Sequence, residues 1–234
     1  MALVTGGARR VGRAIALALA QAGYDIAITW HTGEADAQRL VGEIVAGGRA
    51  AVAIQADLTD PPAAVRRIAE TIQSLSVLVN NASIYEPGDL RDATAEQWRR
   101  MWAVHVESPL LLCRQFETQL RQSRGHVVNM LDLLAERPWP KYLAYCASKG
   151  ALWNLTLSLA KELSPEVTVN GIAPGVVQWP AEYPAEEREK YLRRVPLGRA
   201  GTPEDVAAAV VFLCSQGSYV TGQILRLDGG RSLT

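Results

Sequence analysis

The fold is decided by residues 2–12, which read A-L-V-T-G-G-A-R-R-V-G. Ala2–Val4 is short and apolar, as expected of a buried strand, and the Ala/Leu-rich segment after the turn predicts a helix over Arg13–Ala22. A glycine-rich turn between a strand and a helix can hold a pyrophosphate at the helix N-terminus. The spacing of its glycines is not G-x-G-x-x-G, and such turns also occur where only a positive φ is needed. Arg9 and Arg10 favour the phosphate interpretation, because a purely structural turn does not require cations.

Beyond this turn, strand-like and helical segments alternate along the chain. The further expected strands are Tyr24–Thr29, Ala50–Ala56, Val77–Val79, Gly125–Met130, Val167–Ile172 and Gln223–Leu227. The further expected helices are Ala35–Ala46, Pro61–Leu75, a long helix from a capping box at Thr94–Gln97 to Gln122, Tyr142–Leu163 and, capped by Thr202, a helix to Leu213. This alternation predicts a single α/β domain, residues 1–234, with a doubly wound parallel sheet.

Composition and charge bound the class of protein. The chain has 234 residues, of which 48% are hydrophobic, which is enough for one full core. Its 24 acidic and 24 basic residues cancel, so nothing in the balance suggests a nucleic-acid or membrane partner. The three cysteines, Cys113, Cys146 and Cys214, are widely spaced and predict reduced thiols rather than disulfides or a metal site. With no signal-peptide pattern and no apolar run of membrane-spanning length, we expect a cytoplasmic protein.

The end of the second strand bears on cofactor choice. Folds that bind NAD usually place a carboxylate near this point to accept the ribose 2′-hydroxyl. Here the strand ends in Trp30-His31-Thr32, with no acid at the tip. A missing acid together with Arg10 favours a 2′-phosphate, and hence NADP(H). His31 and Thr32 could contact that phosphate. It is equally plausible that the two residues belong to an ordinary exposed loop and bind nothing.

Tyr145 and Lys149 stand four residues apart in a predicted helix, so their side chains share one face. An unperturbed tyrosine has a pKa near 10, and lowering this pKa to neutrality requires roughly 4 kcal/mol of stabilisation of the phenolate. One cation about 4 Å away, at an effective dielectric near 20, supplies roughly that much. The pair is therefore sufficient for an activated proton donor, although an isolated match is more often a solvated helix face. Asp132 follows strand Gly125–Met130 at the sheet edge where α/β proteins bind ligands.

Taken in order, the motifs resemble those of the short-chain dehydrogenase/reductase family over essentially the whole chain. The matching residues are Thr5-Gly6 with Gly12, Asn80-Asn81-Ala82, Tyr145-x-x-x-Lys149, Pro174-Gly175 and Asp228-Gly229-Gly230. The resemblance implies a Rossmann-type sheet of seven parallel strands, order 3-2-1-4-5-6-7, with helices on both faces. It also implies NADP(H) as cofactor and a homotetramer, or a dimer, formed through the helices of 98–122 and 142–163. By position it places at the cofactor Gly6, Arg9, Arg10, Val11, Gly12, His31, Thr32, Asp57, Leu58, Asn81, Ala82, Ser83, Tyr145, Lys149, Pro174, Gly175 and Val177.

Three departures from the family pattern resemble its pteridine reductase branch, which includes dihydromonapterin reductases. Asp132 stands thirteen residues before Tyr145, where the family normally has serine, and Arg10 and Ser83 replace the usual residues at their positions. This resemblance implies that Arg10 contacts both the cofactor pyrophosphate and the pterin. It also implies that Ser83, Tyr85 and Trp179 line the pterin site together with the catalytic residues.

One further departure falls on the helix at Thr94–Gln122. The family's usual helix asparagine falls at His105 here. A histidine at that position could relay a proton or be a buried structural residue.

Asp132 carries the chemical argument. Reduction of a C=N bond needs hydride at carbon and a proton at nitrogen, and a carboxylic acid is a stronger donor than a serine hydroxyl. An ionised Asp132 would raise the pKa of Tyr145 and oppose Lys149, so we expect Asp132 to act protonated or to share its proton with Tyr145. The alternative is that Asp132 only caps the next turn. The catalytic residues predicted are thus Asp132, Tyr145 and Lys149, with no metal.

These residues predict an NADPH-dependent reductase of a pterin ring C=N bond, with dihydropterin, dihydromonapterin, dihydrobiopterin or dihydrofolate as substrate. The enzyme alternative is a carbonyl reductase or alcohol dehydrogenase that acts on oxoacyl, sugar or other ketones. A third possibility is a nucleotide-binding protein that has lost turnover, which the retained Tyr145 and Lys149 argue against. The stretch 176–200, which contains a charged segment over 186–194, is expected to form a substrate lid.

Overall fold

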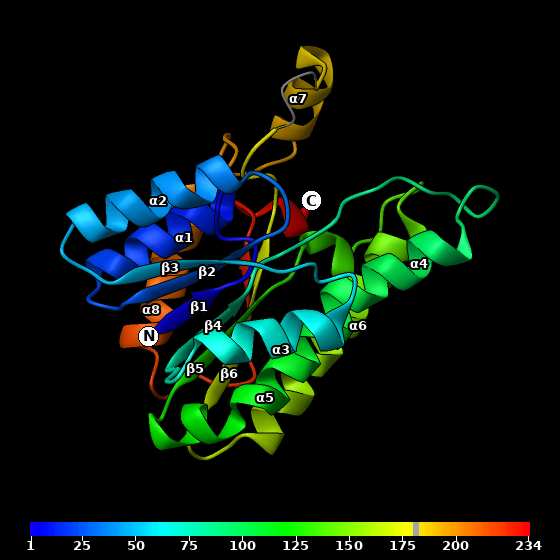
Figure 1. The fold of residues 1–234 in the computed structure, drawn as a ribbon. Helices are drawn as coiled ribbons and strands as arrows, with labels where there is room; N and C mark the ends of the chain where they lie inside the picture. Colours follow the sequence, from blue (N-terminus) through cyan, green and yellow to red (C-terminus); the bar gives the residue numbers. More distant parts are fainter. Residues whose placement is uncertain (180–182) are drawn as a thin grey trace.

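The computed structural model describes residues 1–179 and 183–234. In these residues the strands form one parallel sheet in the order β3-β2-β1-β4-β5-β6-β7, which confirms the predicted topology (Figure 1). The strands are β1 (Ala2–Val4), β2 (Ile26–Trp30), β3 (Ala51–Gln55), β4 (Val77–Asn80), β5 (His126–Met130), β6 (Thr168–Pro174) and β7 (Ile224–Leu227). The chain steps outward from β1 to β3 and then returns to place β4 beside β1. At such a reversal the loops after the two strands part, which opens a crevice at the carboxyl edge.

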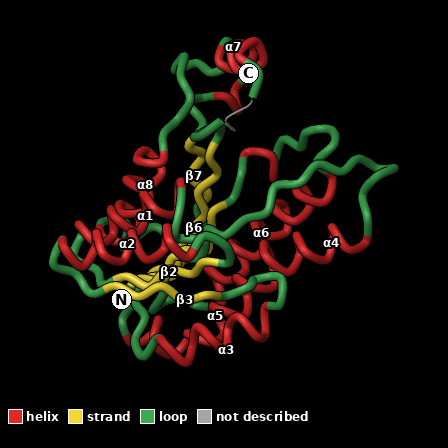
Figure 2. Tube along the Cα trace, turned by 45° about the horizontal axis from the view of Figure 1, so that its top comes forward, coloured by secondary structure: helices red, strands yellow, loops and turns green. Residues whose placement is uncertain are grey.

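Helices cover both faces of the sheet (Figure 2). They are α1 (Arg10–Gln21), α2 (Glu34–Ala46), α3 (Pro61–Thr71), α4 (Ala95–Trp102), α5 (Ser108–Gln122), α6 (Leu143–Glu162), α7 (Ala185–Leu192) and α8 (Pro203–Ser215). Side chains of α1, α2 and α8 share one core with one face of the sheet, and those of α3, α5 and α6 share a second core with the other face. No helix within the described residues has the length and hydrophobicity needed to cross a membrane.

The central strands β1 and β4 are apolar except for Asn80 at the end of β4, because each of them faces a core on both sides. In β1, Ala2 and Val4 belong to one core, whereas Leu3 between them belongs to the other. In β4 the same alternation places Val77 and Val79 opposite Leu78. Successive strand residues point to opposite faces, so a strand covered on both sides needs a continuous apolar run.

Several predicted boundaries were wrong. The first helix begins at Arg10 rather than Arg13, so the glycine turn is tighter than expected. The predicted helix Thr94–Gln122 is interrupted by a π-helical turn over Ala103–Glu107, which apolar spacing does not reveal. The other predicted ends coincide with the observed ones or differ from them by at most four residues.

The predicted capping box at Thr94 is only half formed. The Thr94 side chain accepts a hydrogen bond from the Gln97 backbone, but the Gln97 side chain donates to the carbonyl of Pro87 instead of returning to Thr94. A reciprocal box occurs at Thr202 and Asp205, at the start of α8. There the shorter acid side chain reaches back to the N-cap backbone.

Helix α7 lies above the carboxyl edge of the sheet, away from both cores (Figure 1). None of its residues is fully buried, in agreement with the charged sequence of 186–194. The predicted lid, 176–200, includes residues 180–182, which lie outside the described residues.

Candidate active site

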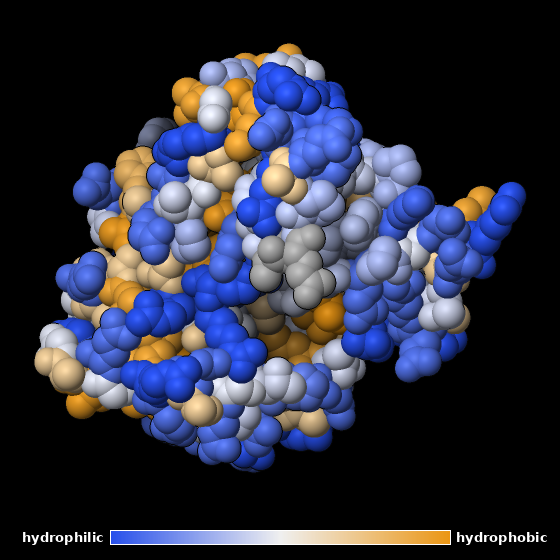
Figure 3. All heavy atoms as spheres, turned by 90° about the horizontal axis from the view of Figure 1, so that it is seen from above, coloured by the Kyte–Doolittle hydropathy of each residue, from blue (hydrophilic) through white to orange (hydrophobic). Residues whose placement is uncertain are grey.

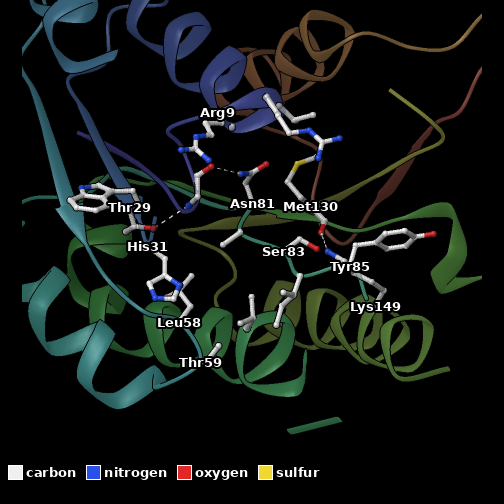
Figure 4. A pocket seen from close by; sticks show the side chains of 18 of the residues that line it. Arg9, Thr29, His31, Leu58, Thr59, Asn81, Ser83, Tyr85, Met130 and Lys149 are labelled. Carbon is white, nitrogen blue, oxygen red and sulfur yellow. Dashed lines mark hydrogen bonds between the residues drawn. The ribbon is translucent and has the colours of Figure 1, made fainter. Parts of the chain in front are cut away.

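A cavity of about 540 Å³ opens at the carboxyl edge of the sheet, where loops from six strands converge (Figure 4). Seen from above, hydrophobic atoms form the floor of a hollow whose rim is mostly polar (Figure 3). The predicted site residues that line the cavity are Gly6, Arg9, Arg10, Val11, Gly12, His31, Asp57, Leu58, Asn81, Ala82, Ser83, Tyr85, Tyr145, Lys149, Pro174 and Val177. Thr32, Asp132, Gly175 and Trp179 do not line it.

Sequence reasoning missed part of the lining. The missed residues are Thr29, Trp30, Ala56, Thr59, Ile84, Arg100, Val104, Met130, Leu131 and Gln178. Most of them adjoin a predicted residue at a strand end, so the rule that ligands bind at the carboxyl edge could have found them. Arg100 and Val104 reach the cavity from α4 and the π-helical turn, and no local pattern in the sequence indicates this.

The glycine loop is held close to the cavity by its neighbours. A Cβ on Gly12 would lie 2.4 Å from the carbonyl oxygen of Gly6, so no side chain fits there. The Asn81 amide donates to the carbonyls of Thr5, at 2.8 Å, and Gly6, at 3.2 Å. The backbone N–H of Gly6 donates to Thr29 Oγ1 at 3.0 Å. The loop backbone is thus fixed at the floor of the cavity, where an anion could approach it.

The two loop arginines point to different parts of the site. Arg9 pairs with Asp36 in the first turn of α2, and Arg39 pairs with the same carboxylate from the other side. Arg10 has φ +51° and donates from Nε to Gln178 Oε1 at 3.0 Å. Arg10 therefore joins the glycine loop to the loop after β6.

His31 and Asp57 lie together at the outer end of the cavity. His31 Nε2 is 3.6 Å from Asp57 Oδ2, and both side chains are well exposed. Asp57 also accepts from the backbone and hydroxyl of Thr59, at 2.9 Å and 2.8 Å. Two elements, the end of β2 and the loop after β3, thus meet at this wall of the cavity.

Asp132 and Tyr145 meet at the opposite end. The phenol of Tyr145 donates to Asp132 Oδ2 at 2.7 Å. The other carboxylate oxygen, Oδ1, accepts from the backbone N–H of Leu134 at 2.9 Å, which caps a short 3₁₀ turn. One oxygen of Asp132 therefore contacts Tyr145 and the other caps the turn, so the cap does not prevent the predicted contact with the phenol.

Burial determines the protonation of this pair. Burial raises the pKa of the Asp132 carboxyl, and the hydrogen bonds from Leu134 and Tyr145 and the charge of Lys149 only partly offset the rise. Burial, followed by the charge of Asp132 and its hydrogen bond, also raises the pKa of Tyr145 well above its usual value. Tyr145 therefore keeps its proton at neutral pH, and the raised pKa of Asp132 means that its carboxyl group binds a proton at a higher pH than an ordinary aspartate does.

Lys149 bonds to a backbone carbonyl and lies beside the ring of Tyr145. Its Nζ donates to the carbonyl oxygen of Met130 at 2.7 Å and lies 5.8 Å from the centre of the Tyr145 ring (Figure 4). Burial lowers the pKa of Lys149 to about 8. Burial and Asp132 raise the pKa of Tyr145, which is the direction expected of a carboxylate that opposes Lys149.

Aromatic rings gather around Tyr145 and Asp132. Tyr85 stacks on Tyr142 with ring centres 4.5 Å apart and meets the edge of Tyr145 at 4.8 Å. Trp179 lies farther out, packed on Tyr191 of α7 at 5.3 Å. Flat apolar surfaces of this kind suit a planar ring ligand.

Comparison with known proteins agrees with this geometry. A family model described as enoyl-(acyl carrier protein) reductase matches residues 6–232. The 3-oxoacyl-[acyl-carrier-protein] reductase FabG of Staphylococcus aureus (strain Mu50) is 35% identical over 238 residues, covering 98% of this chain and 96% of that protein.

Solved structures are similar over the whole length. A blue fluorescent protein from a metagenomic library, in complex with NADPH, superposes with a TM-score of 0.92 at 35% identity, covering 99% of this chain and 97% of the other. FolM alternative dihydrofolate reductase 1 from Brucella canis, complexed with NADP, superposes with a TM-score of 0.90 at 34% identity, covering 100% of this chain and 94% of the other. With these matches and the Tyr145/Lys149 site, the chain belongs to the short-chain dehydrogenase/reductase family of oxidoreductases.

Proposed function

We propose that this oxidoreductase uses NADPH to reduce a C=N bond in a pterin ring, converting a dihydropterin to its tetrahydro form. The observation that carries the proposal is the 2.7 Å hydrogen bond between the Tyr145 phenol and the Asp132 carboxyl. A ketone reductase needs one hydroxyl proton donor and a neutral hydrogen-bonding partner. A ring nitrogen is a better base than a carbonyl oxygen, and a carboxyl group of raised pKa is matched to it.

The residues of the cavity fit a dinucleotide. Gly6 and Gly12 line the cavity and carry no side chain that would shield the backbone of the turn from a pyrophosphate, and Arg9 and Arg10 supply positive charge beside them. His31 and Asp57 would border the adenosine end, and Ser83, Tyr145 and Lys149 the nicotinamide end. Bound there, the nicotinamide supplies the hydride.

The chain's own groups supply the proton and its stabilisation. The Asp132–Tyr145 pair holds a transferable proton at the cavity wall, and one negative charge remains on the pair when that proton leaves. The buried ammonium of Lys149 favours that charge, since it lowers the pKa of Asp132. Lys149 is kept in place by its hydrogen bond to Met130, at the end of β5.

Two further observations support a pterin. The stacked rings of Tyr85 and Tyr142 offer a flat surface directly beside Tyr145. FolM, which is similar over the whole chain, is named as a dihydrofolate reductase. A ketone remains the second candidate, because FabG, named as a 3-oxoacyl reductase, is equally similar in sequence.

NADPH oxidation with a panel of substrates tests the proposal. We expect turnover with dihydropterins, weaker turnover with dihydrofolate, and at least tenfold lower kcat/KM with acetoacetyl and diketone substrates. A preference for the ketones would support the carbonyl reductase instead. Measurable NADPH binding without oxidation by any substrate would indicate a protein that only binds the nucleotide.

Arg9 is expected to determine the preference for NADPH. It lines the cavity, whereas Arg39 pairs with the same carboxylate of Asp36 from outside it. We predict that Arg9→Gln weakens NADPH binding by about tenfold or more and leaves NADH binding nearly unchanged, because only NADPH carries the 2′-phosphate. Fluorescence titration with both nucleotides measures this, with Arg39→Gln as the matched control. Equal losses for NADPH and NADH would contradict the assignment.

We also propose a homotetramer, in a cytoplasmic location, with 176–200 as the substrate lid. Trp98 and Trp102 of α4 stack on each other with ring centres 6.1 Å apart while remaining about 40% exposed. Leu110 of α5 and Leu143 of α6 are also exposed on the helices predicted to form the interface. Exposed aromatic and aliphatic side chains of this kind favour an association surface.

A further inference from the structure

His105 is fully buried in the π-helical turn and bonds to two other elements. Its Nε2 lies 3.2 Å from the backbone nitrogen of Ile84 and 3.0 Å from Ser83 Oγ, both in the loop after β4. Its Nδ1 lies 2.8 Å from Ser148 Oγ in α6, between Tyr145 and Lys149 in sequence. The ring is therefore bonded on one side to the cavity loop and on the other to the catalytic helix.

The partners determine which nitrogen carries the proton. The backbone N–H of Ile84 is only a donor, so Nε2 must accept and cannot be protonated. The proton is then on Nδ1, which donates to Ser148 Oγ, and Ser148 in turn donates to the Tyr145 carbonyl at 2.8 Å. Burial and the charge of Lys149 lower the pKa of His105 well below its usual value, which keeps the ring neutral.

This tautomer has a consequence for Ser83. A serine hydroxyl has one proton, and the neighbours that Ser83 has within the protein, Nε2 of His105 and the phenol oxygen of Tyr145, both present lone pairs to it. Ser83 lines the cavity, whereas His105 does not. The oxygen of Ser83 therefore presents lone pairs, and no proton, to a molecule bound in the cavity.

We propose that His105 is a positioning residue that makes Ser83 a hydrogen-bond acceptor, so that Ser83 binds an N–H group of the substrate ring. A pterin carries ring N–H and amino donors, whereas a ketone carries none at its reacting group. This inference rests on the proposed function for the identity of the substrate. The direction of the Ser83 hydroxyl depends on its contacts with His105 and Tyr145 and not on the identity of the substrate.

A double-mutant cycle tests the coupling. We expect Ser83→Ala and His105→Ala each to raise KM for dihydropterin by about tenfold, the value of one hydrogen bond, with little change in kcat. Because His105 acts through Ser83, the double variant should be no worse than either single one. Additive losses would overturn the proposal.

Two conservative variants distinguish the contact of Nε2 with Ser83 from the contact of Nδ1 with Ser148, and they remain informative even if His105→Ala folds poorly. Glutamine can place a carbonyl oxygen near the position of Nε2, whereas asparagine reaches only the position of Nδ1. We expect His105→Gln to retain nearly the wild-type KM, His105→Asn to lose about tenfold, and Ser148→Ala, which removes only the α6 partner, to resemble the wild type. Equal changes in KM for His105→Gln and His105→Asn, or a larger rise in KM for Ser148→Ala, would show that the contact with Ser148 of α6 matters instead, and would overturn the proposal.

A nitrogen NMR spectrum tests the tautomer without any substrate. The chain has three histidines, so the signal lost in His105→Asn identifies His105. We expect a neutral ring protonated on Nδ1. A ring protonated on Nε2 would overturn the proposal even if pterins are reduced. An Nδ1–H ring in a protein that reduces no pterin would contradict only the proposed function.

Discussion

The Asp132→Ser variant should lose about 100-fold in kcat with a dihydropterin, the usual contribution of a positioned acid, while NADPH affinity stays within about twofold. Serine cannot supply the acidic proton that the carboxyl group holds through its raised pKa. It also cannot reach the Tyr145 phenol and the Leu134 backbone together, as the two oxygens of Asp132 do. Stopped-flow or steady-state NADPH oxidation measures the loss.

Asp132→Asn provides the matched control for the structural part of this effect. Its amide oxygen can still accept from Leu134 and cap the 3₁₀ turn, but the side chain has no acidic proton. We expect Asp132→Asn to melt near the wild-type temperature and to be as slow as Asp132→Ser with the pterin. If Asn were fully active, the cap would be the only role of Asp132.

Tyr145→Phe should reduce kcat by about 1000-fold or more with any substrate, because Tyr145 lines the cavity and its phenol is the group that we propose as the proton donor. The ring that packs against Tyr85 and His105 would remain, so we expect folding and NADPH binding to be preserved. Single-turnover kinetics with pre-bound NADPH separates a loss in the chemical step from a loss in binding.

Tyr142→Phe is the control for Tyr145→Phe. Tyr142 stands at the N-terminus of α6 and stacks on Tyr85, without a hydrogen bond to Asp132 among the described contacts. We expect it to retain most of the wild-type kcat. A Tyr145→Phe enzyme within about tenfold of wild type would remove Tyr145 from the proton-transfer step.

The sheet could be predicted because its signal is local. Each strand is a short apolar run between turn residues, and burial on both faces, as at Leu3 and Val4, requires that pattern. The order of the strands did not follow from the runs themselves. It came from the family resemblance carried by Gly12, Asn81 and Tyr145, and the observed topology confirms it.

Most of the residues predicted for the site do line the cavity, but the contacts between their side chains were predicted less well. Sequence spacing placed Tyr145 and Lys149 on one helix face, but whether the ammonium meets the phenol or a carbonyl depends on β5, and Lys149 bonds to Met130. The partner of Arg10 was missed because Gln178 lies 168 residues away in a loop with no motif. The contacts of His105 depend on a π-helical turn that leaves no mark in the apolar spacing.

The pH dependence of kcat for dihydropterin, compared between wild type and Asp132→Ser, tests the central claim most directly. The pKa of Asp132 is raised, so its protonated fraction increases as the pH falls through that raised value. We predict that wild-type kcat rises as the pH falls from about 8 to about 5, and that the rise is absent in Asp132→Ser. A flat wild-type profile over this range, with Asp132→Ser fully active, would contradict the account.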